Sequence, residues 1–211
     1  MKLPNIEYKG DISKFIEAKD NPYEAISFYK DTDYFTDEIM YNKFVKEVEK
    51  LVRTSKDYSA FVSYIKNILG INFCQVSSKI YDTDATIEMH HGPIFTLYDI
   101  CCVILNYYIK TGRKITTFRI ANAVIEEHFA MRVQVVMMAV TNHEAIKNRD
   151  IYLNVHQGIG NVNEFIKMYA DCFDDNQKYK IWSYINMSKM NDSFDTGILD
   201  TEHIAKMIKF E

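Results

Sequence analysis

The chain is poor in proline and glycine, the two residues that most often interrupt regular structure. It has 3 prolines and 7 glycines among 211 residues. Proline lacks the backbone N–H that helices and sheets use, and glycine is the residue that tight turns most often require. We therefore expect long elements with few turns. Internal repeats and low-complexity tracts are also absent, so the sequence shows no firm domain boundary.

Long apolar runs and a strong charge of one sign are lacking as well. No stretch reaches the roughly 18 consecutive apolar residues of a membrane-spanning helix, and the segment MKLPNIEYKGDIS lacks the apolar core of a signal peptide. The net charge is −4 and the isoelectric point is about 5.9. This balance excludes a strongly cationic coat for nucleic acid but leaves a local basic patch open. We expect no membrane as a partner.

Cysteine is scarce and irregularly spaced. The four cysteines, Cys74, Cys101, Cys102 and Cys172, match no zinc-binding pattern. Cys101 and Cys102 are neighbours in an apolar run with helical spacing. We expect reduced, buried thiols in a cytosolic protein.

The hydrophobic share of 47% is high enough for a sizeable core. Apolar side chains recur at helical spacing through most of the chain. Thr96 and Asp99 predict a capping box at the start of one helix, and Gly112 predicts its end. Helices are expected at residues 36–52, 58–69, 96–110, 116–129, 162–172, 176–188 and 200–209, after an arm with one or two short helices at 1–35.

Four shorter segments have the pattern of strands. They are residues 72–80, 85–91, 132–138 and 150–156. In ATIEMHH (85–91), the alternation of a strand places Glu88 and His90 on one face and His91 on the other. The predicted fold class is α+β, mainly helical with a small antiparallel sheet.

Two further histidines lie on predicted helices. His143 is carried by a short helix after the third strand, which is expected to begin with a capping box of Thr141 and Glu144. His128 ends the helix at 116–129. We interpret it as a structural residue, favoured there by the helix dipole, rather than as a metal ligand.

The order of strand, strand and short helix favours a ββα-metal site. Such a nuclease needs a divalent cation on the scissile phosphate, a neutral imidazole that takes a proton from water, and a group that orients this imidazole. His90 and His143 are the candidate metal ligands, His91 the candidate general base and Gln134 the candidate orienting group. Composition alone would favour a structural role for the histidine pair.

Three segments carry a resemblance to a known family. They are VEKLVRTSKDYSAFVSYIKNILGINFCQV, IEMHHGPIFTLYDI and QVVMMAVTNHEAIKNRDIYLNVHQGIGNVNEFIKMY. Over residues 44–170 the chain resembles the HNH-like (His-Me finger) proteins of large tailed bacteriophages. The resemblance implies a ββα-metal element with His90 and His143 as metal ligands, His91 as general base, and one Mg²⁺ or Mn²⁺ ion.

The same resemblance implies a function and a location. It implies an endonuclease-related protein that hydrolyses DNA phosphodiesters in the host cytoplasm, with a place in the virion left open. We accordingly divide the chain into an N-terminal helical region (1–70), an HNH-like core with a two-helix insertion (71–170), and C-terminal helices (171–211).

Lys147 departs from the family pattern, which has a second histidine four residues after His143. A protonated lysine has no lone pair for a metal, and its charge repels a cation. Lys147 and Arg149 are therefore candidate DNA contacts, together with Arg113 and Lys114 in the link TGRKIT. The alternative hypothesis is a catalytically degenerate protein of the same fold. It would act as a structural, transcription-associated or host-interaction module, with a phage or host protein as partner.

Overall fold

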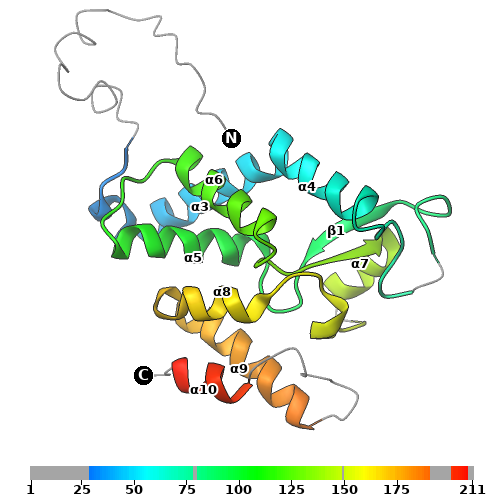
Figure 1. Cartoon of the computed structure of the whole chain (residues 1–211). Coiled ribbons are helices and arrows are strands. Elements are labelled where there is room, and N and C mark those ends of the chain that lie inside the picture. The colour runs from blue at the N-terminus through cyan, green and yellow to red at the C-terminus, as the bar shows by residue number, and fades with distance from the viewer. Residues whose placement is uncertain (1–28, 78–79, 149, 191–200, 209–211) are drawn as a thin grey trace, which may run out of the picture.

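The computed structural model of the chain describes residues 29–77, 80–148, 150–190 and 201–208 (Figure 1). The described part is mainly helical and contains a two-stranded antiparallel sheet, which confirms the predicted α+β class. Most of the arm predicted at 1–35 lies outside the described residues. Within 29–35, Lys30 forms a β-bridge with Ile115, and Thr32–Phe35 forms the short helix η1.

Three helices form the centre of the core. They are α3 (Glu38–Thr54), α5 (Leu97–Lys110) and α6 (Thr117–Phe129), and each packs against the other two. Helix α4 (Lys56–Asn67) packs against α3 and α6. The apolar stripe predicted for α3 is the buried one, since Val45, Val48 and Val52 have no exposed surface. Burying a side chain of this size contributes about 1.5–3 kcal/mol.

Side-chain caps define where these helices begin. The side chain of Thr116 accepts a hydrogen bond from the backbone N–H of Arg119 at the start of α6. At the start of α5, Thr96 and Asp99 form the predicted capping box in both directions. A cap of this kind contributes about 1 kcal/mol, because it satisfies a backbone N–H that the helix itself leaves without an acceptor.

The sheet pairs β1 (Ile87–His91) with β2 (Val135–Ala139). In its register Ile87 lies opposite Ala139, and His91 lies opposite Val135. Helix α7 (Val140–Lys147) follows β2 without a loop and packs against both strands. The alternation predicted for β1 is confirmed: His91 faces α4 and α6, whereas His90 faces α7.

The strand predicted at 72–80 is wrong, because Gln75 is the only described residue of this segment whose backbone bonds to β2. Its backbone N–H donates to the carbonyl of Met137 at 2.8 Å, and its side-chain oxygen accepts from the N–H of Met137 at 2.7 Å. The side chain thus takes the acceptor position that the backbone carbonyl of Gln75 itself would fill in an antiparallel pair. Among the described residues of this segment, no further bridge to β2 forms.

Two other sequence predictions in this region are also wrong. The segment 150–156 is not a strand: it runs into the short helix η2 (Val155–Gln157), where the side chain of Gln157 accepts from the N–H of Asn154. Helix α7 has no capping box at Thr141, because β2 continues directly into the helix at Val140.

The C-terminal helices are α8 (Val162–Met168), η3 (Ala170–Cys172), α9 (Asp175–Met190) and α10 (Thr201–Met207). Figure 1 shows α8, α9 and α10 beneath the α5 layer. An ion pair ties α9 to α5, since the Lys180 amine lies 2.7 Å from the nearly buried Asp99 carboxylate. No described helix has the length and apolarity that crossing a membrane requires. All four cysteines are free and buried, as predicted.

Candidate functional site

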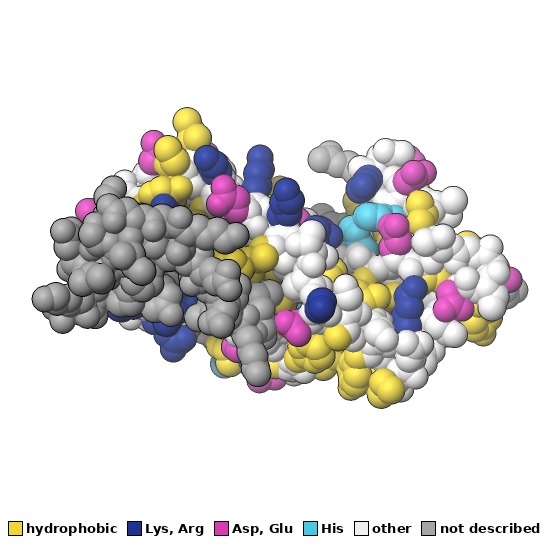
Figure 2. All heavy atoms as spheres, turned by 90° about the horizontal axis from the view of Figure 1, so that it is seen from above, with side chains coloured by type: hydrophobic (Ala, Val, Ile, Leu, Met, Phe, Trp, Pro, Cys, Tyr) yellow, Lys and Arg dark blue, Asp and Glu magenta, His cyan; other side chains and the backbone are white. Residues whose placement is uncertain are grey.

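The face of the sheet that meets α7 carries a small cluster of titratable side chains. The rings of His90 on β1 and His143 on α7 meet edge to face, with centroids 4.8 Å apart. Nδ1 of His143 lies 3.2 Å from Oε2 of Glu88. Figure 2 shows histidine side chains in a recess of the surface, beside acidic and basic side chains. Sequence reasoning therefore placed His90 and His143 together correctly, although it gave Glu88 no role.

His90 is electrically neutral at physiological pH. Burial lowers its pKa to about 4, and the neighbouring His143, Lys147 and Arg53 act in the same direction. Lys147 follows His143 by four residues on α7, so both side chains lie on one side of this helix. The ammonium group of Lys147 thus raises the electrostatic potential where a metal ion would have to bind.

His91 lies on the opposite face of β1, in a closed aromatic environment. Its Nε2 is 2.8 Å from Nε2 of His128, and its ring stacks on Tyr58 at an interplanar angle of 12°. Nδ1 of His128 lies 2.7 Å from the carbonyl oxygen of Val124, which can only accept, so Nδ1 carries the proton. In neutral His128 the Nε2 atom is then the acceptor, and Nε2–H of His91 donates to it. Burial holds the pKa of His91 well below its usual value.

This placement gives no support to His91 as general base. Its exposed fraction is 5%, and it does not share a face of the strand with His90 and His143. A base has to reach water that is bound to the same metal as the ligands. The role assigned to His91 stays a prediction.

His128 is a structural residue, as predicted, but for another reason than the helix dipole. It has no exposed surface, and its ring also meets Phe61 edge to face. Burial lowers the pKa of His128 to about 4. The residue is therefore neutral, and the interaction of a positive charge with the helix end does not explain it.

Gln134 precedes β2 and is almost fully buried. Its Nε2 donates to the carbonyl of Val155 at 2.6 Å, whereas its Oε1 has no hydrogen-bond partner among the described residues. The side chain lies over Gly158, where a Cβ atom would approach Cγ of Gln134 to 2.4 Å. Gln134 thus ties the loop after α7 to the sheet, and its role in orienting His91 stays a prediction.

The histidine cluster does not fit the Mg²⁺ ion expected there. Within the described ranges, no group of three or more His, Cys, Asp or Glu side chains is arranged to hold a metal. The available donors are two imidazoles and a carboxylate already engaged by one of them. Mg²⁺ prefers oxygen ligands in an octahedral arrangement. The ββα-metal element is therefore not shown, although the sheet and α7 follow its order of elements.

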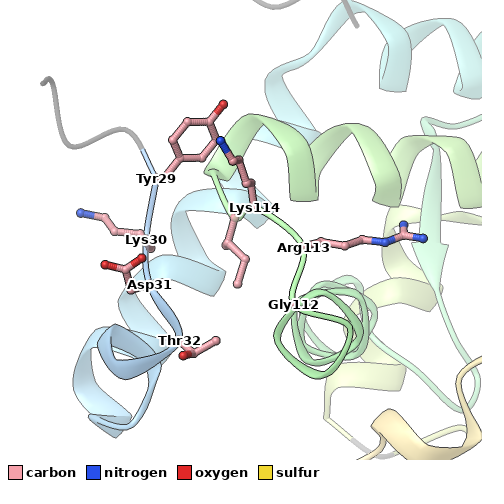
Figure 3. A pocket seen from close by; sticks show the side chains of 8 residues that line it. Tyr29, Lys30, Asp31, Thr32, Gly112, Arg113 and Lys114 are labelled. Atoms are coloured by element: carbon pink, nitrogen blue, oxygen red, sulfur yellow. The ribbon is translucent and has the colours of Figure 1, made fainter. Parts of the chain in front are cut away.

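A second candidate site lies at the other end of the molecule from α7 (Figures 1 and 3). Residues 29–32 and 112–115 enclose a pocket of about 480 Å³, which we call the basic pocket. It contains Arg113 and Lys114, two of the four predicted nucleic-acid contacts. A third, Lys147, is on α7, so the structure does not bring the predicted contacts together. Arg149 lies outside the described residues.

Comparison with known proteins decides the family. Residues 3–210 match the bacteriophage G278-like virion proteins. The chain belongs to this family. No curated protein and no solved structure matches it. The phage origin implied by the sequence resemblance is thereby supported, whereas the match gives no support to an HNH-type endonuclease.

Sequence reasoning missed half of the basic pocket in this virion-family protein. Lys30 and Tyr29 belong to a segment that carried no clear pattern, and they reach the pocket through contacts with residues more than 80 positions away. One signal was present in the sequence: residues 100–125 contain no aspartate or glutamate, although the chain has 29 of them. The four cations of that stretch therefore lack local counter-charges.

Proposed function

We propose that the chain is a component of the phage particle that acts through binding rather than through catalysis. The observation that carries this proposal is the family match, which extends over residues 3–210 and therefore over nearly the whole chain. It favours the structural alternative over a nuclease and a place in the virion over one confined to the host cytoplasm.

The geometry of the histidines supports this choice. The residue that a hydrolase would use as base, His91, is buried against His128, and the candidate ligands His90 and His143 lie on the other face of the strand. Catalytic groups need to surround one reacting atom. These three side chains do not share a space in which a scissile phosphate would be bound.

Mass spectrometry of purified particles tests the proposal. The chain is expected in density-purified virions at a fixed copy number relative to the major capsid protein, and it should remain there after a high-salt wash. Detection only in infected-cell lysate, with particles free of it, would contradict a virion role. An unrelated phage protein of similar abundance in the lysate serves as the control for carry-over.

A nicking assay tests the endonuclease hypothesis. Purified protein with Mn²⁺ is expected to leave supercoiled plasmid intact, and the His143→Ala variant should behave identically. Metal-dependent nicking that this substitution abolishes would restore the nuclease hypothesis.

A further inference from the structure

The basic pocket is built from two segments that are distant in the sequence. The backbone N–H of Lys30 donates to the carbonyl of Ile115 at 2.9 Å and joins residues 29–32 to the link between α5 and α6. This link follows the C-terminus of α5 and precedes the Thr116 cap of α6, so both of its ends are fixed by helices. The pocket is therefore a defined feature of the fold.

The cations around this pocket are held by aromatic rings instead of carboxylates. The Lys114 amine lies 4.9 Å from the centre of the Tyr29 ring, and the Arg119 guanidinium 5.7 Å from the same ring. Arg113 lies 4.9 Å from the ring of Tyr107. Such contacts contribute about 0.5–1 kcal/mol at exposed sites and leave most N–H donors open to a ligand.

Counter-charges are scarce at this place. Lys110, at the end of α5, pairs with Asp171 at 3.3 Å. For Lys30, Arg113, Lys114 and Arg119, no carboxylate of the described residues lies within ion-pairing distance. Asp31 lines the pocket, but Figure 3 shows its carboxylate on the side that points away from the 112–115 link.

The N-terminus of α6 adds to the positive potential. Its first turn contains no acidic residue, and Arg119 lies in that turn. A helix N-terminus carries roughly half a positive charge, so acidic residues are normally favoured there. The arrangement is unfavourable for the isolated chain and becomes favourable when an anion is present.

The directions of the side chains indicate an extended anion rather than a single ion. Figure 3 shows the Lys114 amine turned to Tyr29 across the pocket, whereas Lys30 and Arg113 extend outward on its two sides. One phosphate cannot contact all three cations. Successive phosphates of a polymer that crosses the 112–115 link can contact them in turn.

We propose that Lys30, Arg113, Lys114 and Arg119 bind the phosphodiester backbone of nucleic acid. The inference rests on the proposed function, because a virion component is placed where it can meet the packaged genome. Arg and Lys contacts to phosphates carry no base specificity, so binding should be independent of sequence. The chain as a whole is acidic, which excludes a broad cationic surface for nucleic acid. A local group of four cations is compatible with this charge balance.

Fluorescence anisotropy with the full-length protein tests this directly. Labelled duplex DNA and labelled single strands of the same sequence are titrated between about 50 and 200 mM salt. In the Arg113→Gln/Lys114→Gln variant, loss of two phosphate contacts should lower the slope of log K against log salt by about 1.8 for duplex, or about 1.4 for single strands. Whichever form shows the change is the one that the pocket binds.

The matched control is Lys43→Gln/Lys46→Gln. These two lysines are exposed on α3, so the variant has the same net charge but an intact basic pocket. It should keep the wild-type slope. Equal losses in both variants, or no loss in the pocket variant, would overturn the proposal. If polyglutamate binds more tightly than DNA at an equal charge concentration, and the pocket variant loses this binding, the pocket is assigned to acidic protein and the proposal is overturned too.

The particle experiment separates this inference from the proposed function. If the chain is absent from purified virions, the proposed function fails whatever the anisotropy shows. If the chain is present but the pocket variant binds DNA like wild type, only the nucleic-acid inference fails. Circular dichroism of both variants checks that these surface substitutions leave the fold intact.

Discussion

The two ends of this molecule use charge and polarity in opposite ways. Around β1, residues that resemble a catalytic site satisfy one another: His91 binds His128, and His143 binds Glu88. Around the α5–α6 link, Lys114 and Arg119 share one tyrosine ring and have no carboxylate partner among the described residues. The histidines of β1 are thus engaged with neighbouring side chains of the fold. The α5–α6 link, which has no recognisable motif, carries cations without a carboxylate partner among the described residues.

The two faces of β1 also differ in how their side chains are used. Neighbouring residues His90 and His91 have almost the same sequence context, but His90 is partly exposed beside His143 and His91 lies in the core. Strand alternation alone decides which of the two imidazoles contributes to stability. Substitutions on the two faces should therefore have very different effects.

The largest effect is expected for the buried pair. His128→Ala removes the acceptor of the His91 Nε2–H and the ring that contacts Phe61, so it leaves both an unsatisfied donor and a cavity. The free energy of unfolding should fall by about 2–4 kcal/mol. His143→Ala, on the other face, should cost about 0.5 kcal/mol or less. Urea denaturation measures both, and similar losses would show that the two faces do not differ in this way.

Acid should destabilise the protein through the same buried ring. The pKa of His128 is about 4 when folded and about 6.5 when unfolded. As pH falls below 6.5, the unfolded chain takes up the proton and the folded chain does not, so stability decreases until pH approaches 4. The contribution is roughly 3 kcal/mol.

Unfolding measured at several pH values between neutrality and 4.5 tests this prediction. The His128→Gln variant is the control, since glutamine does not titrate and should remove most of this contribution. Burial also lowers the pKa of His91 and of His90, the latter to about 4, so the variant should keep the part of the pH dependence that these two residues contribute. An unchanged pH profile in His128→Gln would refute the assignment.

The regular parts of the fold were predictable because their signals are local. The stripe of α3, the Thr96–Asp99 box and the alternation of β1 depend on residues within one or two turns of each other. The failures have long-range causes. Gln75 is held at β2 by a residue 62 positions away, so its segment could not be distinguished from a strand. Nothing local marked Lys30 as the partner of Ile115.

In the candidate site, too, local signals were predictive and long-range contacts were not. Spacing correctly placed His90 near His143 and Lys147, because strand alternation and helical periodicity are local rules. Spacing could not show that His91 would meet His128, which lies 37 residues later on α6. A histidine pair in a strand indicates proximity to other elements, but the partner that each imidazole meets decides whether it is available for chemistry.

The smallest effect on stability, and the sharpest test of the histidine cluster, is expected for Lys147→His. The substitution places an imidazole four residues after His143 on the same side of α7, with the ring of His90 opposite. Without metal, the change should alter the free energy of unfolding by no more than about 0.5 kcal/mol, as is usual for surface positions.

Zn²⁺ or Ni²⁺ should then stabilise the variant but not the wild type. Imidazoles suit these ions, and three of them would replace a site that now holds two imidazoles and an ammonium group. At a metal concentration 100 times Kd the gain is about 2.7 kcal/mol, which a thermal-shift assay detects readily. A Lys147→Gln variant removes the charge without adding a ligand and should not respond. If it responds as strongly as Lys147→His, repulsion by the lysine, rather than the missing third ligand, is what keeps a metal from this face of the sheet.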